Sequence, residues 1–263
     1  MKATEIFERI NNAKKDLEFL PTGLSNLDGS LDGGFIKEEL VVIGGFTGIG
    51  KSYIASQIMY NIAVGGFKSA YFSLEITNQM VLSRLIGQQA DVKSIKVVTG
   101  NMQDFEHKKV IEAEGKILGY EAYMDFYDDM YEFDKIQQTI KDNDYEFVVI
   151  DFIQNIIVKG MDEYERLSYI SLMLQKLAKE KKCCILVLSQ LSNSIARNIN
   201  QSQLEYKGSG AIATVCDLGF FLVREIDHSI SLDKLTLALR KNRRGVSGQK
   251  WELSFEGEGG LIV

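Results

Sequence analysis

A glycine-rich loop between an expected strand and an expected helix constrains this chain more than any other feature. Residues 45–52 read GFTGIGKS, which matches the pattern GxxxxGK[ST], and the loop follows the apolar run Leu40–Ile43. A buried strand that leads through such a loop into a helix directs backbone N–H groups and the positive helix end at phosphate oxygens. The alternative is a flexible glycine turn that spells the motif by chance. The flanking strand and helix favour a site for a nucleoside triphosphate.

The residue types in the loop suit a triphosphate that carries a magnesium ion. Glycines let the main chain curl into a nest of amides, and Lys51 reaches the β- and γ-phosphates as a point charge. The Ser52 hydroxyl suits a Mg²⁺ coordination position. The predicted nucleotide-binding residues are Gly45, Thr47, Gly48, Ile49, Gly50, Lys51 and Ser52.

Strands and helices alternate along most of the chain, which predicts an α/β fold with a mostly parallel sheet. Strands are expected at 40–43, 69–73, 122–126, 146–151 and 183–189, and helices at 3–15, 51–63, 77–89, 104–118, 132–142 and 163–182. After residue 217 three strands follow one another, at 217–224, 233–241 and 249–255, which predicts antiparallel hairpins at the sheet edge. With 263 residues and no break in composition, one α/β unit with extensions is expected.

Three further strands end in polar residues, and ligands of open α/β sheets lie at the carboxyl ends of strands. Asp151 follows the apolar run Phe147–Ile150 and is expected to face the phosphates and Mg²⁺. Glu75 is a candidate to orient and deprotonate the attacking water, or alternatively an acid that stabilises a helix N-terminus. Gln190 is a candidate partner of the γ-phosphate, although Ser-Gln is also common where loops begin.

The segment Arg240–Arg244 contains four cations in five residues, at the tip of an expected hairpin. Like charges crowded at a turn repel each other, so an anionic partner is expected. One interpretation is a cation offered to the γ-phosphate of the nucleotide in the next subunit. The other is a solvated turn.

Charge and composition restrict the classes of function. The formal net charge of −6 confines any contact with nucleic acid to a groove or a ring interior. The charged N-terminus and the absence of a long apolar run exclude a signal peptide and a membrane span. Cys183 and Cys184 are adjacent in an apolar strand and point to opposite faces, which disfavours a disulfide or metal site. Buried thiols suit a reducing cytoplasm, of a bacterium or a phage-infected host.

Taken in order, these motifs resemble the C-terminal ATPase domain of DnaB-type replicative helicases, within the RecA-like family. The resemblance extends from about Phe19 to Phe255 and rests on residues 44–52, 72–75, 149–154, 189–192, 207–212 and 241–243. A phosphate loop occurs in many families, whereas this series in this order and spacing is specific. It implies a RecA-like P-loop NTPase fold over residues 19–263, preceded by a linker-type helix within residues 1–18.

The resemblance implies roles for the residues of one ATP site. Lys51 and Ser52 correspond to the phosphate and Mg²⁺ ligands, and Asp151 looks like the Walker B acid. Glu75 looks like the catalytic carboxylate and Gln190 like the γ-phosphate sensor. ATP and Mg²⁺ are the implied cofactors.

The resemblance also implies contacts beyond one subunit. Lys241 and Arg243 look like the cations inserted into the neighbouring subunit's site, and Lys207-Gly208-Ser209-Gly210 looks like a channel loop that holds single-stranded DNA. The implied partners are single-stranded DNA, further copies in a hexameric ring, and a primase or loader.

Two departures from the family pattern leave other functions open. Only about 18 residues precede the core, so a primase-interacting collar is expected to be absent or supplied by another chain. Of the family's Glu-Gln-Asp-rich stretch, only Asp217 matches. The leading hypothesis is a replicative helicase of a phage or plasmid type. The alternatives are a RecA-like recombination or accessory ATPase that forms filaments on DNA, and a nucleotide-gated switch or loader partner.

Overall fold

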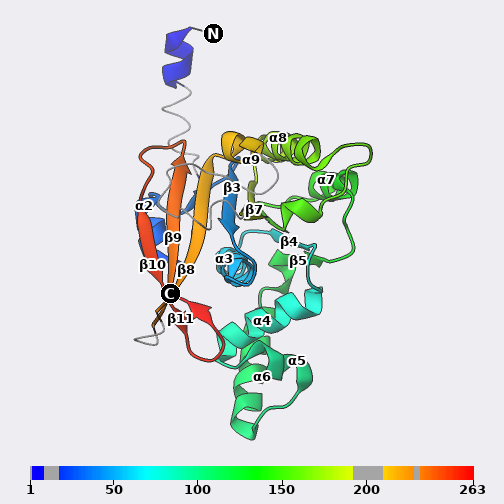
Figure 1. Ribbon diagram of the computed structural model, residues 1–263, viewed down its shortest axis with the longest axis vertical. Coiled ribbons are helices and arrows are strands. Elements are labelled where there is room, and N and C mark those ends of the chain that lie inside the picture. The colour runs from blue at the N-terminus through cyan, green and yellow to red at the C-terminus, as the bar shows by residue number, and fades with distance from the viewer. Residues whose placement is uncertain (1, 9–17, 192–209, 228–231) are drawn as a thin grey trace.

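An eight-stranded sheet organises the chain, with strands in the order β10-β9-β8-β3-β7-β6-β4-β5 (Figure 1). The computed structural model describes residues 2–8, 18–191, 210–227 and 232–263. Six neighbouring strands from β8 to β5 are parallel, whereas β9 and β10 are antiparallel. The strands are β3 (Leu40–Gly45), β4 (Ser69–Ser73), β5 (Met124–Tyr127), β6 (Phe147–Asp151), β7 (Cys184–Gln190), β8 (Leu218–Asp227), β9 (Leu232–Asn242) and β10 (Lys250–Leu253). The expected parallel sheet with C-terminal hairpins is confirmed.

Helices cover both faces of this sheet because successive strand residues are apolar and point to opposite sides. In β3, Val41 and Ile43 join one core cluster while Leu40 and Val42 join the other. The first cluster packs against α3 (Lys51–Val64), α4 (Asn78–Ala90) and α6 (Asp104–Leu118). The second packs against α7 (Phe133–Asp142), α8 (Glu163–Lys181) and α9 (Gly210–Val215).

The C-terminal end differs from the expected third edge strand at 249–255. Only Lys250–Leu253 pairs with β9, and the chain then leaves the sheet to form a separate hairpin of β11 (Phe255–Glu256) and β12 (Leu261–Ile262). This hairpin packs on α3, where the Gln57 side chain accepts a hydrogen bond from Ile262 N at 2.8 Å. The departure brings C-terminal residues beside the phosphate loop, on the side where α3 begins.

Several short elements were not expected from the sequence. They are α2 (Ser25–Ser30), α5 (Ser94–Thr99), α9, two 3₁₀ turns (Glu121–Tyr123 and Ile153–Asn155), and the pair β1 (Phe19–Leu20) and β2 (Phe35–Ile36). Of the helix expected at 3–15, residues 3–8 are helical and residues 9–17 lie outside the described residues.

Two further findings concern the cysteines and the helices. Cys183 and Cys184 are buried in different core clusters, and the described part of the chain holds no cluster of His, Cys, Asp and Glu suited to a metal ion. Within the same residues, no helix has the length and apolar character required to cross a membrane.

Candidate active site

The polar carboxyl ends of four neighbouring parallel strands, β3, β7, β6 and β4, lie side by side. Gly45 pairs with Gln190 across β3 and β7, and Ser73 pairs with Asp151 across β4 and β6. Glu75 follows Ser73 by two residues. Parallel pairing therefore brings the four predicted chain segments together, because parallel strands end at the same edge.

The loop between β3 and α3 has the conformation of an anion cradle. Gly48 and Gly50 have φ angles of 77° and 108°, in the region that favours glycine. Gly50 precedes α3 and, among the described residues, no side chain caps this helix end and no acid lies in its first turn. A Cβ atom at Gly50 would lie 2.7 Å from Cζ of Phe255. The first amides of α3 are therefore suited to bind phosphate oxygens.

Lys51 is largely buried at the mouth of this loop, with 9% of its surface exposed. Its Nζ donates hydrogen bonds to the carbonyl oxygens of Gly45 and Phe46, both at 2.9 Å. Burial lowers the pKa of Lys51, and the carboxylates of Asp151 and Glu75 act in the opposite direction. The loop thus holds a cation beside two carboxylates, as a site for a triphosphate with a divalent cation requires.

Asp151 is almost fully buried below the loop, with 1% of its surface exposed. Burial raises the pKa of Asp151, while hydrogen bonds from Ser52 and Tyr71 and the charges of Lys51 and Arg84 lower it. The Tyr71 hydroxyl donates to Asp151 Oδ2 at 2.8 Å. A serine hydroxyl and a carboxylate side by side form an oxygen donor set of the kind that Mg²⁺ binds.

Glu75 is exposed at the pocket, outside the helix that follows it. Helix α4 is capped by Thr77, and its first turn contains no acid, so the interpretation of Glu75 as a helix-stabilising acid is disfavoured. Partial desolvation and the neighbouring Asp151 raise the pKa of Glu75, and the charges of Lys51 and Arg84 oppose this rise. A carboxylate with a raised pKa that is accessible from the pocket is suited to accept a proton from water.

Gln190 is the last residue of β7, and its backbone is hydrogen-bonded to the segment that follows β6. Its backbone N–H donates to Gln154 Oε1 at 3.3 Å, and Gln154 Nε2 donates to Ser189 Oγ at 2.9 Å. The backbone that carries Gln190 is therefore hydrogen-bonded to the segment that follows Asp151.

A cavity of about 490 Å³ contains most of the predicted site. The predicted residues that line it are Thr47, Gly48, Gly50, Lys51, Ser52, Glu75 and Gln190. Gly45, Ile49 and Asp151 are not part of the lining; all three are buried next to it. Residues that were not predicted complete the wall: Tyr53, Ile76, Arg84, Arg224, Phe255, Glu258, Gly259 and Gly260.

The unpredicted wall combines aromatic rings with guanidinium groups. The Arg224 guanidinium lies over the Phe255 ring at 5.4 Å, and Tyr53 meets Phe255 edge to face at 6.3 Å. Arg84 lies over the other aromatic ring, 5.1 Å from the centroid of Tyr53. The turn that follows Phe255 is held by Asp91, whose Oδ1 accepts Glu258 N at 2.7 Å. No motif marks such a wall, because stacking surfaces have no fixed spacing in sequence.

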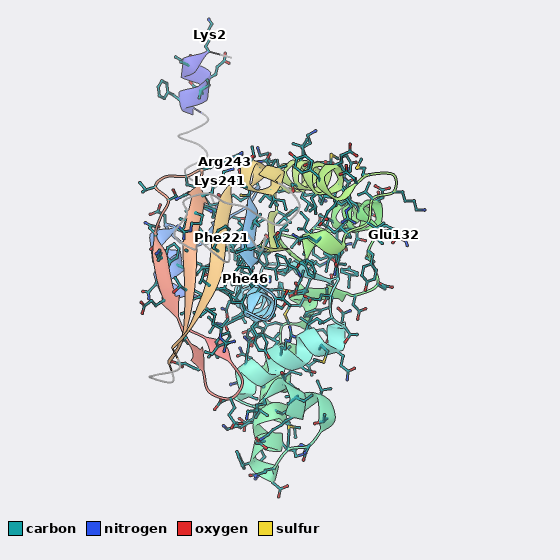
Figure 2. The ribbon with its side chains drawn as sticks, in the orientation of Figure 1. Lys2, Phe46, Glu132, Phe221, Lys241 and Arg243 are labelled. Carbon is teal, nitrogen blue, oxygen red and sulfur yellow. The ribbon has the colours of Figure 1, made fainter. Side chains whose placement is uncertain are left out.

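The cations at the tip of the β9–β10 hairpin lie near the start of β3, at the opposite end of this strand from the phosphate loop. Figure 2 shows Lys241 and Arg243 at the upper end of the sheet and Phe46, of the phosphate loop, well below them. Lys241 Nζ donates to the carbonyls of Ala213 and Thr214 at 2.8 and 2.6 Å. Lys241 and Arg243 are therefore not brought into the pocket of their own chain.

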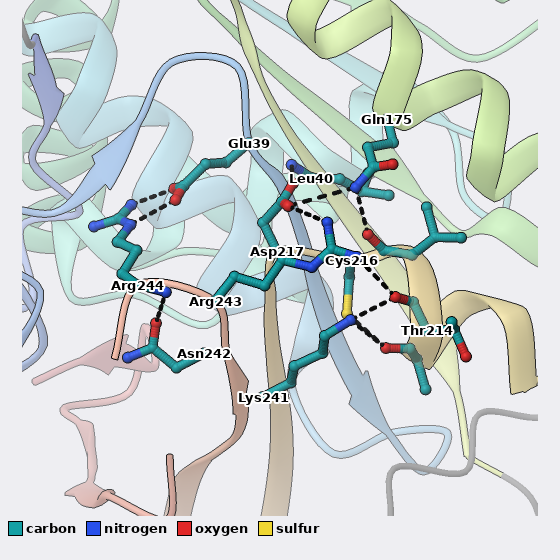
Figure 3. A network of polar contacts seen from close by, with 12 residues as sticks. Glu39, Leu40, Gln175, Thr214, Cys216, Asp217, Lys241, Asn242, Arg243 and Arg244 are labelled. Atoms are coloured by element: carbon teal, nitrogen blue, oxygen red, sulfur yellow. Dashed lines mark hydrogen bonds and ion pairs between the residues drawn. The ribbon is translucent and has the colours of Figure 1, made fainter. Parts of the chain in front are cut away.

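The negative charge expected opposite these cations comes in part from the same chain (Figure 3). Arg243 pairs with Asp217 at 2.9 Å, and Arg244 forms a two-pronged ion pair with Glu39. Both carboxylates are mostly buried, with 12% of each side chain exposed. The segment is therefore not simply a solvated turn, and part of its positive charge is balanced within the chain and not by an external anion. The role of Arg243 in a neighbour's site stays a prediction.

The predicted DNA-binding loop falls almost entirely outside the described part of the chain. Lys207, Gly208 and Ser209 are not described, and Gly210 is exposed at the first position of α9.

Residues 20–260 match the sequence profile of a family described as "DnaB-like helicase C terminal domain". The "Replicative DNA helicase DnaB" of Treponema pallidum is 29% identical over 249 residues, which are 92% of this chain and 55% of that protein. The chain thus spans about half the length of the curated relatives it matches.

Solved structures show the same fold. One that is described as an ATPase domain superposes with a TM-score of 0.82 at 23% identity, covering 99% of this chain and 96% of that one. Another, described as "The Structure Of A DnaB-Like Replicative Helicase And Its Interactions With Primase", gives a TM-score of 0.85 at 22% identity, covering 99% of this chain and 65% of that one.

Proposed function

The chain belongs to the family of DnaB-like helicase C-terminal domains, and from this premise we propose that it is the ATP-driven motor of a replicative DNA helicase. The observation that carries the proposal is the meeting of Lys51, Asp151 and Glu75 at one sheet edge, beside an uncapped helix end. A cation, a buried acid and an accessible acid at such a helix end suit the hydrolysis of a bound triphosphate.

The nucleotide phosphates would lie on the loop amides and Lys51, because both present positive charge to the cavity. Ser52 and Asp151 would hold Mg²⁺, which neutralises charge on the phosphates when bound. Glu75 would orient the attacking water and accept its proton, and Gln190 would sense the γ-phosphate. Phe255 and Arg224 would hold the base, since an aromatic ring and a guanidinium plane both stack on purines.

Hydrolysis would require two subunits. Arg243 and the phosphate loop lie at opposite ends of the parallel strands, which supports a role for Arg243 at a neighbour's nucleotide and not at its own. Repetition of such a head-to-tail contact generates a closed ring when the rotation closes. A hexameric ring around single-stranded DNA is the assembly that we propose, with Lys207-Gly208-Ser209-Gly210 facing the DNA backbone. A primase or loader is a proposed further partner.

Two segments would have distinct roles in this assembly. We assign residues 19–263 to the ATPase domain and residues 1–18 to a linker that docks on another subunit. The helix at residues 3–8 supports this, since Ile6 and Phe7 are 44% and 65% exposed. Replication of this kind implies a cytoplasmic location in a bacterium or a phage-infected host.

A strand-displacement assay tests the proposal. Forked DNA with 5′ and 3′ single-stranded tails is incubated with the protein and ATP, and with a non-hydrolysable ATP analogue. We expect unwinding with ATP but not with the analogue. The Lys51→Ala variant should not unwind the fork. Equal strand separation with the analogue would exclude a motor, and ATP hydrolysis without unwinding on any fork would favour a filament-forming or switch ATPase. Electron microscopy with ATP and single-stranded DNA then separates closed rings from helical filaments.

A further inference from the structure

Tyr71 carries a hydroxyl group into one of the two hydrophobic core clusters. It lies in the middle of β4, fully buried, with its ring stacked on Phe126 of β5 at a centroid distance of 6.3 Å and an interplanar angle of 27°. The residues that pair beside it in register, Val149 on β6 and Phe126 on β5, are apolar. A phenylalanine would keep the stacking on Phe126, so the hydroxyl requires a separate explanation.

The Tyr71 hydroxyl is used by the buried acid of the candidate active site. It donates to Asp151 Oδ2 at 2.8 Å, and Ser52 forms a second side-chain hydrogen bond to the same carboxylate. The phenol is the donor in this pair, because a carboxylate oxygen accepts hydrogen bonds. The carboxylate is therefore fixed from two sides, by a group from β4 and a group from the phosphate loop.

Hydrogen bonds to a metal-binding carboxylate from outside the coordination sphere orient it, and their removal typically weakens metal affinity by about 10- to 100-fold. We propose that Tyr71 is a positioning residue for the Mg²⁺–nucleotide site, holding the Asp151 carboxylate in the orientation at which it and Ser52 face the same ion. This inference rests on the proposed function, in which Asp151 and Ser52 hold Mg²⁺. It adds a residue that no motif of the site contains.

The test is a Mg²⁺ titration of nucleotide binding in Tyr71→Phe. Affinity for a fluorescent ATP analogue is measured in EDTA and at increasing Mg²⁺, with no turnover required. Nucleotide affinity in EDTA should stay within about twofold of the parent protein, because the loop and Lys51 are intact. The apparent affinity for Mg²⁺ should fall roughly 10-fold. Tyr71→Leu, which also lacks the donor, should give the same loss.

Tyr145→Phe is the matched control. Tyr145 is 2% exposed and its hydroxyl also donates to a carboxylate, Asp125 Oδ2 at 2.7 Å, but it does not line the cavity. It should lose stability in thermal unfolding without losing Mg²⁺ affinity. Unchanged Mg²⁺ affinity in folded Tyr71→Phe, or an equal loss in Tyr145→Phe, overturns the inference.

Asp151→Asn separates this inference from the function on which it rests. It should remove the effect of Mg²⁺ on nucleotide affinity. If Asp151→Asn responds to Mg²⁺ like the parent protein, the assignment of Asp151 as a metal ligand is wrong. If Asp151→Asn loses the response while Tyr71→Phe keeps it in full, the metal site stands and Tyr71 has no role in it.

Discussion

Arg243 Nη1 lies 2.9 Å from Asp217 Oδ1, so the guanidinium proposed for a neighbour's nucleotide is held by a carboxylate of its own chain. Asp217 Oδ2 also accepts a hydrogen bond from Leu40 N at 2.9 Å. Leu40 opens β3, the strand that ends in the phosphate loop. One buried strand therefore has the nucleotide loop at one end and the anchor of the candidate trans-acting cation at the other.

Arg243→Ala should abolish ATP hydrolysis while nucleotide binding stays nearly intact. The guanidinium would stabilise charge that develops on the transferred phosphate, an effect of about 10³–10⁵ in turnover. Steady-state hydrolysis and the affinity for a fluorescent ATP analogue check the two halves of this prediction.

Mixing two inactive variants tests whether Arg243 acts on a neighbour. Lys51→Ala contributes an intact Arg243, and Arg243→Ala contributes an intact pocket, so some interfaces of a mixed assembly would be complete. Hydrolysis should reappear in the mixture and depend on the ratio of the two proteins. A mixture as inactive as its components would show that Arg243 does not act between subunits.

Glu75→Gln should bind ATP normally and lose turnover by roughly 100-fold or more, the scale of general-base catalysis. Single-turnover hydrolysis measures the chemical step directly. Glu258→Gln is the control, because Glu258 lines the same cavity in the turn held by Asp91. If Glu75→Gln reduces turnover only slightly, Glu75 is not the general base.

The raised pKa of Glu75 predicts a pH dependence with a definite sign. A general base must be ionised, so kcat should fall as the pH falls through a pKa above the ordinary glutamate value. In the folded protein the raised pKa means more bound proton than in the unfolded chain, so stability should decrease as the pH rises through this interval. Both effects should be weaker in Glu75→Gln, as shown by pH–rate profiles and thermal unfolding.

Arg244→Ala should destabilise the fold more than Arg243→Ala does. Arg244 pairs with the mostly buried Glu39 and donates to the carbonyl of Gly34 at 3.0 Å. Its removal leaves a buried carboxylate without its partner, at a cost of about 3 kcal/mol in the free energy of unfolding. Denaturant unfolding should show this loss. Arg243→Ala should show a smaller one, because the Arg243 side chain is 45% exposed and Asp217 keeps its hydrogen bonds from Leu40 N and Gln175 Nε2.

Phe255→Leu should weaken ATP binding by about fivefold, since it removes a stacking surface whose contacts with a base and a guanidinium contribute roughly 1 kcal/mol. The affinity for tripolyphosphate should not change, because that ligand has no base. Phe105→Leu is the control on α6, with an exposed ring outside the cavity. Equal losses for ATP and tripolyphosphate would place the base elsewhere.

The sequence predicted the β3–loop–α3 unit because each part has a local cause. An apolar run forms a buried strand, glycines permit positive φ angles, and Lys51 and Ser52 open the helix. The α/β alternation predicted the parallel sheet, and parallel pairing then required Asp151 and Gln190 to end at the same edge as the loop. The local sequence pattern and the sheet topology were therefore sufficient to predict where these residues lie in the fold.

Tertiary structure alone decided the base-side wall and the partners of the cations. Phe255 reaches the cavity only because the chain leaves the sheet after Leu253, and Tyr71 meets Asp151 across two strands that are 80 residues apart in sequence. Pairings such as Arg244 with Glu39 join residues separated by 205 positions. Local periodicity carries no information about such contacts, because they depend on how distant elements pack and not on the conformation of either segment.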